Sequence, residues 1–481
     1  MDNLDKHTIN SDICSDIYFL FVFFKKETNL IFLLKGLYNK VLFLCYTYPM
    51  DITDLYEKFI ACNQELSTDT RRITPGSMFF AWKGEVHDGN TFAGEALEKG
   101  ARYVVIDNPD FFIDERTLVV KDSIQTLQHL ARYHRQQFQI PVIAIGGSNG
   151  KTTTKELVAQ VLATQKDVVA SLGSLNNHVG VPLTLLRMNT LTDIVVVEMG
   201  ANHVGEIQEL CTIAEPTHGL ITNIGRDHIG LFGNQEAIIV ANTELYNYLR
   251  DHGGHVFVNK NNMTLMKYAQ GIEQTCYGED IDGEFGIRSQ HTAPYVSFLW
   301  KHHTVNTHLT GEYNLENIVG AISIGVHFNI IEDNIITAIE SYLPNNNRSE
   351  LVQTDKGNII IKDFYNANAT SMKFALQNLA DVARKYPDKK SIAILGDMLE
   401  LGEFSIGEHQ DVLDFARSLD FEKIILVGPD FKQTEHVGIE CYLNIDEVIS
   451  TLQKSPPENA TILLKASHGT NFTQLFNGIE W

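Results

Sequence analysis

The stretch PVIAIGGSNGKTTTKE, residues 141–156, decides how the centre of this chain folds. Its apolar residues 142–145 predict a short buried strand, and the pattern of an amphipathic helix begins at Thr153. The turn between them consists of Gly147, Ser148, Asn149, Gly150, Lys151 and Thr152. A phosphate-binding loop needs this order of strand, glycine turn and helix, because backbone N–H groups then converge on phosphate oxygens at a positively polarised helix end.

The residue types in this turn favour ATP as the ligand. Lys151 can neutralise the β- and γ-phosphates, and the Thr152 hydroxyl can ligate Mg²⁺. Only Ser148 and Asn149 separate the two glycines, whereas the usual loop has four residues there, so this is a shortened variant. A chance glycine turn is the alternative interpretation, but the strand, the Gly-Lys-Thr sequence and the helix together favour nucleotide binding.

Composition narrows the class of protein. The chain has 481 residues, enough for about three domains, and its 44% hydrophobic content is ample for buried cores. The 38 basic and 60 acidic residues give a net charge of −22, which argues against a nucleic-acid partner. The six cysteines are scattered without a CxxC pair, which predicts free thiols in a reducing cytoplasm.

The first 49 residues differ from the rest. They contain apolar runs at 17–24 and 31–46, the second interrupted by Lys35 and Lys40. Neither run reaches the roughly 20 residues that span a bilayer. We therefore expect no stable membrane anchor, a functional start at Met50, and an extension (1–49) outside the functional fold.

The remaining pattern predicts three α/β domains. Residues 50–139 form a small unit, with strands at 77–82 and 103–107 and a helix at 91–99. Residues 140–343 form the ATP-binding domain, with parallel strands at 142–145, 193–198 and 219–223 in a doubly wound sheet. A hinge at 344–347 leads to a Rossmann-like domain (344–481), with strands at 359–363, 391–395, 423–427 and 461–465.

Two strand ends in the middle domain carry candidate metal ligands. Glu198 follows an apolar strand, and an acid there can complete a Mg²⁺ shell with Thr152 and phosphate oxygens. His228, beside Asp227, follows the next strand and is a second candidate ligand. A lone histidine is as often a surface or core residue, so the sequence alone leaves both interpretations of His228 open.

Further stretches, in this order along the chain, resemble the Mur ligase family from residue 51 to the C-terminus. They are STDTRRITPGSMFFAWKG (67–84), GSNGKTTTKE (147–156), SLNNHVGVPLTLL (174–186), EMGANHVGEI (198–207), TNIGRDHIGLFG (222–233), GEYNLENIVGA (311–321), NNRSE (346–350), DFYNANATSM (363–372) and LGDMLELGEFSIGEH (395–409).

The resemblance implies an ATP-dependent amide ligase of peptidoglycan precursor synthesis. Its implied substrates are UDP-N-acetylmuramoyl-tripeptide and D-alanyl-D-alanine, joined through an acyl phosphate, with two Mg²⁺ sites. The implied catalytic residues are Lys151, Glu198 and His228, and the implied metal ligands are Thr152, Glu198 and His228. The implied ATP-binding residues are the loop from Gly147 to Thr153, Asn314, Asn317, Arg348 and Asp363. The implied substrate-binding residues are Thr68, Asp69, Thr70, Arg71, Asn176, Asn177, Asn366, Asn368, Lys465 and Ser467.

One departure from the family pattern concerns the second metal. Most members carry a lysine that becomes carbamylated and bridges two metal ions, but this chain has Asn242 at that position. An asparagine offers a carbonyl oxygen without the negative charge, which puts the second site in doubt. Glu244 is a possible substitute ligand. Gly230 also stands where an acid is common.

Other interpretations stay open. The chain can be another amino-acid ligase of this family, or a degenerate ligase that binds nucleotide or UDP-peptide without turnover. A generic P-loop ATPase explains neither flanking domain. Locally, Asn176 and Asn177 can be helix caps, Asp69 and Arg71 a surface pair, His409 a solvated residue, and Phe364 and Tyr365 packing residues. Nothing in the sequence requires more than a monomer.

Overall fold

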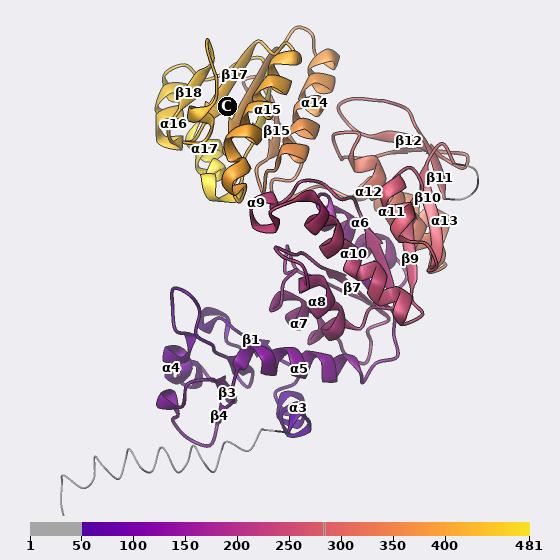
Figure 1. Ribbon diagram of the computed structural model, residues 1–481, viewed down its shortest axis with the longest axis vertical. Coiled ribbons are helices and arrows are strands. Elements are labelled where there is room, and N and C mark those ends of the chain that lie inside the picture. The colour runs from indigo at the N-terminus through magenta and orange to yellow at the C-terminus, as the bar shows by residue number, and fades with distance from the viewer. Residues whose placement is uncertain (1–50, 282, 284) are drawn as a thin grey trace, which may run out of the picture. The chain divides into compact units, whose positions relative to one another are not determined.

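The computed structural model describes residues 51–281, 283 and 285–481. They divide into two compact units, and the division along the chain falls between Leu127 and Gln128 (Figure 1). The hypothesis about the extension at 1–49 lies outside the described residues. Among the helices that are described, none is long and apolar enough to cross a membrane.

The first unit is built on a parallel sheet of short strands. Its order is β1-β2-β3-β4, with β1 Leu66–Ser67, β2 Met78–Phe80, β3 Tyr103–Ile106 and β4 Thr117–Val119. The helices α3 (Ile52–Ala61) and α4 (Ala93–Glu98) accompany it, and α5 (Ser123–Arg135) runs across the boundary into the second unit. Phe79, Val104 and Ile106 pack with alanines of α4 in a small apolar core.

The second unit contains a large sheet of order β13-β12-β11-β10-β9-β8-β5-β7-β6. The parallel part comprises β5 (Val142–Gly146), β6 (Val168–Ala170), β7 (Ile194–Glu198), β8 (His218–Ile221), β9 (His255–Asn259), β10 (Glu273–Glu279) and β11 (Gly286–Ser289). The hairpin β12 (Ser297–Trp300) and β13 (His303–Asn306) continues it antiparallel. The phosphate-loop strand β5 therefore lies between β7 and β8, so the ends of all three meet at one edge.

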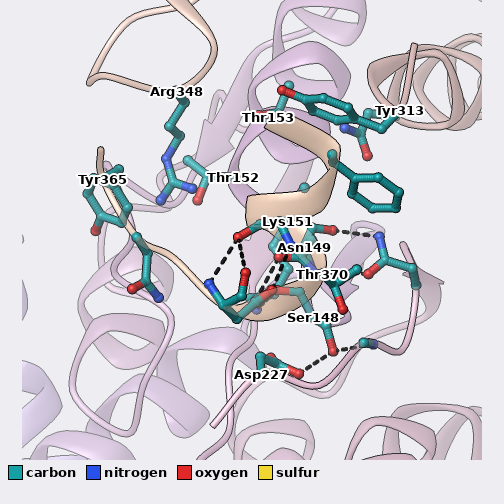
Figure 2. Close-up of a pocket in the computed structure, with 18 of the residues that line it drawn as sticks. Ser148, Asn149, Lys151, Thr152, Thr153, Asp227, Tyr313, Arg348, Tyr365 and Thr370 are labelled. Carbon is teal, nitrogen blue, oxygen red and sulfur yellow. Dashed lines mark hydrogen bonds between the residues drawn. The ribbon is translucent and has the colours of Figure 1, made fainter. Parts of the chain in front are cut away.

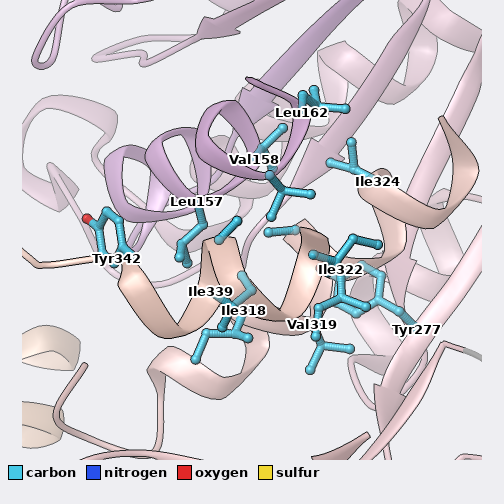
Figure 3. Packing of buried hydrophobic residues seen from close by; sticks show 14 of the residues in the cluster. Leu157, Val158, Leu162, Tyr277, Ile318, Val319, Ile322, Ile324, Ile339 and Tyr342 are labelled. Atoms are coloured by element: carbon cyan, nitrogen blue, oxygen red, sulfur yellow. The ribbon is translucent and has the colours of Figure 1, made fainter. Parts of the chain in front are cut away.

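Helices cover this sheet and fix the strand ends. They are α6 (Lys151–Ala163), α7 (Gly180–Leu185), α8 (Glu206–Ala214), α9 (Ile229–Phe232), α10 (Gln235–Asp251), α11 (Met263–Tyr268), α12 (Asn314–His327) and α13 (Glu332–Ser341). Figure 3 shows apolar side chains of α6 and α12 facing one another, among them Leu157, Val158 and Ile322, all buried. The helix that begins at the phosphate loop is thus packed against the helix that carries Asn314 and Asn317.

A second sheet in the same unit has the order β14-β15-β19-β16-β17-β18. Its strands are β14 (Glu350–Gln353), β15 (Ile359–Asp363), β16 (Lys390–Gly396), β17 (Lys423–Val427), β18 (Glu440–Tyr442) and β19 (Ala460–Lys465), all parallel except β14. The helices α14 (Ala369–Lys385), α15 (Ser405–Ser418), α16 (Ile445–Lys454) and α17 (Phe472–Gly478) pack around it.

The α/β fold class predicted from the sequence is confirmed, with parallel sheets in each part. The predicted strands 359–363 and 423–427 coincide with β15 and β17. The helix after the phosphate loop begins at Lys151, two residues before the predicted start, because Gly150 in the left-handed conformation serves as its N-cap. The antiparallel hairpin β12–β13 was not predicted. The predicted domain bounds (50–139, 140–343 and 344–481) stay predictions.

Three histidines gather near the start of β8 and β9. His218 opens β8, His255 opens β9 and His327 ends α12, with ring centroids 4.5 to 5.8 Å apart. Burial, together with the smaller effects of His327 and His255, lowers the pKa of His218 to about 3. The pKa values of His255 and His327 are lowered too, although Glu273 opposes this. The cluster is therefore neutral in the folded protein at neutral pH.

We expect this cluster to make folding sensitive to acid. Below pH about 6.5 the unfolded chain binds a proton at His218 that the folded chain does not bind. The free energy of unfolding should then fall by about 1.4 kcal/mol for each pH unit between about 6.5 and about 3. Urea unfolding at pH 7 and pH 5 checks this. His218→Phe should show a smaller loss than the native chain, while the exposed His129→Gln should not. Equal losses in all three proteins contradict the prediction.

Candidate active site

A cavity of about 770 Å³ lies in the second unit, where the phosphate loop faces residues of the second sheet (Figure 2). Seventeen of the residues predicted from the sequence line it: Ser148, Asn149, Gly150, Lys151, Thr152, Thr153, Asn176, Asn177, Glu198, His228, Asn314, Asn317, Arg348, Asp363, Asn366, Asn368 and Lys465. They come from many different segments of the chain, so the fold is what brings them together.

Both glycines of the phosphate loop are needed for its shape. Gly147 has φ +116°, and a Cβ atom there would lie 2.2 Å from Thr222 Oγ1 and 2.9 Å from the Asn223 carbonyl oxygen. Gly150 has φ +82°, and its Cβ atom would lie 2.5 Å from Asn317 Oδ1. Other residues rarely adopt such φ values, and these neighbours leave no room for a side chain. The loop conformation thus depends on glycine at both positions.

The start of the loop is held by the segment after β8. The Ser148 and Asn149 amides donate to the carbonyl oxygen (2.9 Å) and Oδ1 (3.1 Å) of Asn223. Ser148 Oγ donates to Asp227 Oδ1 and accepts from the Gly225 amide at 2.8 Å. No side chain caps α6, whose first-turn N–H groups lack partners within the helix. Those amides are the groups available to an anion.

Lys151 and the asparagines of α12 complete this side of the cavity. Lys151 Nζ donates to the carbonyl oxygens of Gly147 (2.6 Å) and Ser148 (3.0 Å), so its cation lies over the loop. Asn317 Oδ1 accepts from Thr154 Oγ1 at 3.0 Å, and Asn317 Nδ2 donates to Asn314 Oδ1 at 3.0 Å. The two asparagines therefore brace the phosphate-loop helix as well as lining the cavity.

Glu198 fits one divalent cation. Its Oε1 accepts from Asn176 Nδ2 at 2.8 Å, while Oε2 is buried and has no hydrogen-bond partner among the described residues. A buried carboxylate oxygen without a partner is costly, and a bound cation satisfies it. Thr152, which is also buried, lines the same cavity. These donors suit a Mg²⁺ ion whose remaining ligands are phosphate oxygens and water.

The residues at the predicted second metal site do not supply a matching set. Asn242 Nδ2 donates to the Ile238 carbonyl oxygen at 2.9 Å within α10. The carboxylate of Glu244 accepts from the Gly205 amide (2.6 Å) and the Gln208 amide (2.9 Å), so it caps α8 instead of replacing the missing lysine. His228 lines the cavity, and its Nδ1 faces the Glu400 carboxylate. Within the described ranges, no group of three or more His, Cys, Asp and Glu side chains is arranged to hold a metal.

The second sheet contributes a buried ion pair at the carboxyl ends of β15 and β19. Lys465 Nζ lies 3.0 Å from Asp363 Oδ2 and donates to the Asn366 carbonyl oxygen at 2.6 Å. Burial lowers the pKa of Lys465, and Asp363 opposes that shift. Asn368 caps α14, and its Nδ2 donates to Asn149 Oδ1 at 2.9 Å. This last bond links the second sheet directly to the phosphate loop.

Arg348, Tyr365 and Tyr313 line the cavity and make contacts with aromatic rings. The Arg348 guanidinium lies 3.7 Å from the centroid of the Tyr365 ring, and the Tyr365 hydroxyl pairs with Ser174 Oγ. Arg348 Nε is buried without a hydrogen-bond partner in the part of the chain that is described. Tyr313 stacks on Phe374 with ring centroids 5.5 Å apart. Figure 2 shows Arg348 and Tyr365 on one side of the loop and Tyr313 on the other.

Tyr365 corrects a prediction from the sequence. We expected both Phe364 and Tyr365 to be packing residues, and only Phe364, which is buried in the core of the second sheet, fits that expectation. Tyr365 lines the cavity. Tyr365 lies in the bend that follows β15, where the alternation of strand residues no longer predicts which way a side chain points.

Several predicted residues lie elsewhere or have other partners. Ser467 Oγ accepts from the Leu399 amide at 3.0 Å and does not line the cavity. Asn177 Oδ1 accepts from the Gly180 amide at 2.9 Å, which is the capping interpretation. His409 is buried, not solvated, and its Nε2 accepts from the Met398 amide at 3.0 Å. Gly147 shapes the loop but does not line the cavity.

The predicted substrate-binding residues Thr68, Asp69, Thr70 and Arg71 belong to the first unit. Arg71 pairs with Asp69 at 2.8 Å and is 86% exposed, and this hydrogen-bonded pair lowers the pKa of Asp69 to about 2. A cavity of about 380 Å³ in the same unit is lined by other residues, including Trp82, Asn90 and Lys121.

Comparison with models of known protein families shows which family this chain belongs to. The description "Mur ligase family, catalytic domain" matches residues 64–145, "Mur ligase middle domain" matches residues 145–325, and "Mur ligase, glutamate ligase domain" matches residues 347–468. The chain belongs to the Mur ligase family. These matches run through both compact units and include the phosphate loop, Glu198, His228, Arg348 and Lys465.

Individual Mur ligases match over most of their length. The UDP-N-acetylmuramoyl-tripeptide–D-alanyl-D-alanine ligase of Bacillus subtilis is 30% identical over 423 residues, covering 85% of this chain and 92% of that protein. The Synechocystis protein of the same name is 33% identical over 393 residues, covering 79% and 82%. A crystal structure of MurF from Acinetobacter baumannii has a TM-score of 0.75 at 26% identity, covering 86% of this chain and 93% of that one.

Proposed function

We propose that this Mur ligase joins D-alanyl-D-alanine to the C-terminal carboxylate of UDP-N-acetylmuramoyl-tripeptide in peptidoglycan precursor synthesis. Conversion of ATP to ADP and phosphate, with the γ-phosphoryl group passing through the tripeptide carboxylate, drives the reaction. The observation that carries the proposal is that one cavity brings the phosphate loop together with Arg348, Asp363, Asn366 and Lys465. The names of relatives at 30% and 33% identity support the choice of substrates. We retain the predicted cytoplasmic location and monomeric state as parts of this proposal.

In the first step, a carboxylate oxygen of the tripeptide attacks the γ-phosphorus of ATP. A new P–O bond forms between the carboxylate and the γ-phosphorus, and the bond from the γ-phosphorus to the β,γ-bridging oxygen breaks. The products are ADP and an acyl phosphate. Lys151 and the first-turn amides of α6 hold the phosphates in line and neutralise charge, which is most of what phosphoryl transfer requires of a protein. Asn314 and Asn317 hold α6 in place and face the nucleotide.

In the second step, the amine of D-alanyl-D-alanine attacks the acyl carbon. The C–N bond forms, phosphate leaves with one oxygen of the original carboxylate, and the amine loses a proton to the solvent. Asn366, Asn368 and Lys465 position the dipeptide, with Ser467 acting through the Leu399 backbone. Arg348 and Asp363 approach the nucleotide from the same side. Alignment of the two reactants is the main contribution of these residues.

Thr152 and Glu198 would hold Mg²⁺, which when bound neutralises the phosphate oxygens and polarises the γ-phosphate. The orphaned Glu198 Oε2 supports this assignment. His228, which lines the same cavity, is the candidate ligand for a second cation. Thr68, Asp69, Thr70 and Arg71 would contact the UDP moiety, and Asn176 and Asn177 the peptide.

Phosphate release tests the proposal. The full chain is assayed with Mg-ATP, UDP-N-acetylmuramoyl-tripeptide and D-alanyl-D-alanine, and each component is omitted in turn. The proposal predicts release that requires all three. Release without the dipeptide indicates another acceptor, such as a single amino acid, and no release with any combination indicates a binding protein without turnover.

The asparagine at position 242 leads to a prediction about whether the rate of phosphate release depends on bicarbonate. Because no lysine stands at this position, removing CO₂ and bicarbonate should leave the native rate unchanged. Asn242→Lys should gain a component of the rate that bicarbonate restores, and the uncharged Asn242→Met should not. The assay is the same phosphate release in degassed and bicarbonate-supplemented buffer. A native enzyme that loses activity on degassing contradicts this account of the second site.

A further inference from the structure

The segment Gly225–Phe232, which we call the docking segment, contacts the second sheet through its backbone. The Gly230 amide donates to the Glu400 carbonyl oxygen at 3.2 Å. A Cβ atom on Gly230 would lie 2.4 Å from the Leu401 carbonyl carbon, 2.5 Å from the Gly402 nitrogen and 2.7 Å from the Glu400 oxygen. All three are backbone atoms, which cannot rotate away as a flexible side chain can. The approach of α9 to this turn therefore requires glycine at position 230.

Charged and apolar contacts flank this backbone contact. Arg226 Nη2 lies 2.6 Å from Glu408 Oε1, and the Glu408 side chain is only 7% exposed. His228 Nδ1 lies close to the Glu400 carboxylate on the same turn. Ile229 is buried in the same apolar cluster as Met398 and Leu401. The docking segment is thus fixed to the second sheet at several points within one turn of chain.

The turn that receives the segment is itself rigid. Asp397 accepts from the amides of Asp430 and Phe431, both at 3.0 Å. The buried His409 accepts from the Met398 amide at 3.0 Å, and Ser467 accepts from the Leu399 amide at 3.0 Å. Polar side chains therefore hold the backbone amides of residues 398 and 399, and the Asp397 side chain ties the same turn to residues 430–431.

The other end of the docking segment holds the phosphate loop. The Gly225 amide and the Asp227 carboxylate both bond to Ser148 Oγ. The same short stretch of chain therefore contacts the phosphate loop at one end and the turn 397–402 of the second sheet at the other. We therefore expect a shift at Gly230 to displace the second-sheet residues, among them Asn366 and Lys465, relative to the loop.

We infer that Gly230 is a positioning residue for the ligation, because it lets the docking segment set the distance between the phosphate loop and the dipeptide-binding residues. This inference rests on the proposed function. Any side chain at position 230 would meet the backbone of residues 400–402.

Gly230→Ala tests the inference, with Gly407→Ala as the matched control. Both glycines lie in helices with ordinary φ, but a Cβ atom on Gly407 meets nothing within 4 Å. We expect Gly230→Ala to lower kcat/KM for D-alanyl-D-alanine by about tenfold to a hundredfold, since a displacement near 1 Å costs that much. The affinity for Mg-ADP should change little, because the contacts of the phosphate loop to Asn223 remain.

Amide hydrogen exchange supplies a readout that does not depend on activity. Peptides covering 226–234 and 397–404 should exchange faster in Gly230→Ala than in Gly407→Ala, while a peptide covering β9 should not change. If the native chain releases no phosphate, the proposed function fails, yet the exchange comparison still tests the contact. If Gly230→Ala shows the same kcat/KM and the same exchange rates as Gly407→Ala, the inference is wrong.

A charge swap covers the case in which Gly230→Ala does not fold. Arg226→Glu should lower kcat/KM for the dipeptide and speed exchange in the same two peptides. The double variant Arg226→Glu with Glu408→Arg should restore both, because it rebuilds the ion pair with the partners exchanged. If Arg226→Glu lowers kcat/KM and speeds exchange but the double variant does not restore them, this ion pair has no docking role.

Discussion

Lys151→Ala should reduce phosphate release at least about a thousandfold while the protein stays folded. Lys151 Nζ lies over the phosphate loop, bonded only to loop carbonyl oxygens in the contacts that the structure records for it. Its charge is available to phosphate oxygens in a cavity that shields it from bulk water, where an electrostatic contact is strong. Removing it also removes two loop contacts, but none of the contacts to Asn223 that hold the loop.

Circular dichroism and thermal melting establish that Lys151→Ala is folded before its activity is compared. Lys151→Met keeps the length of the side chain without the charge, so it separates the electrostatic effect from packing. Lys166→Ala, a substitution outside the cavity, serves as the control for losing a lysine. A ligation rate near that of the native protein in Lys151→Met would contradict the proposal that this loop binds the γ-phosphate of ATP.

Glu198→Gln should produce the second large effect, a loss of about a hundredfold or more in turnover at saturating substrates. Glutamine keeps the oxygen that accepts from Asn176 and replaces the unpartnered buried Oε2 with an amide nitrogen. The site then loses its negative charge at the position proposed for Mg²⁺. The Mg²⁺ concentration for half-maximal rate should rise, since a neutral oxygen is a weaker ligand than a carboxylate.

Two measurements on Glu198→Gln separate binding from chemistry. A Mg²⁺ titration of phosphate release reports the apparent affinity, and Mn²⁺ binding with a non-hydrolysable ATP analogue reports occupancy without turnover. The exposed Glu209→Gln, on α8, is the matched control. An unchanged Mn²⁺ affinity in Glu198→Gln would remove this carboxylate from the metal site.

The sequence predicted the phosphate loop well because every contact that defines the loop type is local. Strand, glycines, lysine and helix lie within 16 residues, and the structure places them as predicted except for the helix start. The strands β15 and β17 were predicted for the same reason, since each is a short apolar run that is buried on both faces. The hairpin β12–β13 was missed because each of its strands is only four residues long and the edge strand β13 is largely polar.

Prediction from the sequence failed for side chains whose hydrogen-bond partners lie far away along the chain. Glu244 looked like a substitute metal ligand, but it caps a helix that begins 38 positions earlier in the chain. Ser467 lies two residues after Lys465, yet the chain turns there, and Ser467 binds the Leu399 backbone instead of lining the cavity. Such outcomes depend on which turns of the fold meet, and side-chain types alone do not reveal this.

The transfer of oxygen tests the central claim most directly. The tripeptide is prepared with ¹⁸O in both oxygens of its terminal carboxylate and incubated with the full chain, Mg-ATP and D-alanyl-D-alanine. The acyl-phosphate route predicts that the released phosphate carries one ¹⁸O and that the amide product keeps the other. Released phosphate without ¹⁸O would mean that water attacked ATP, which would contradict the proposed ligation.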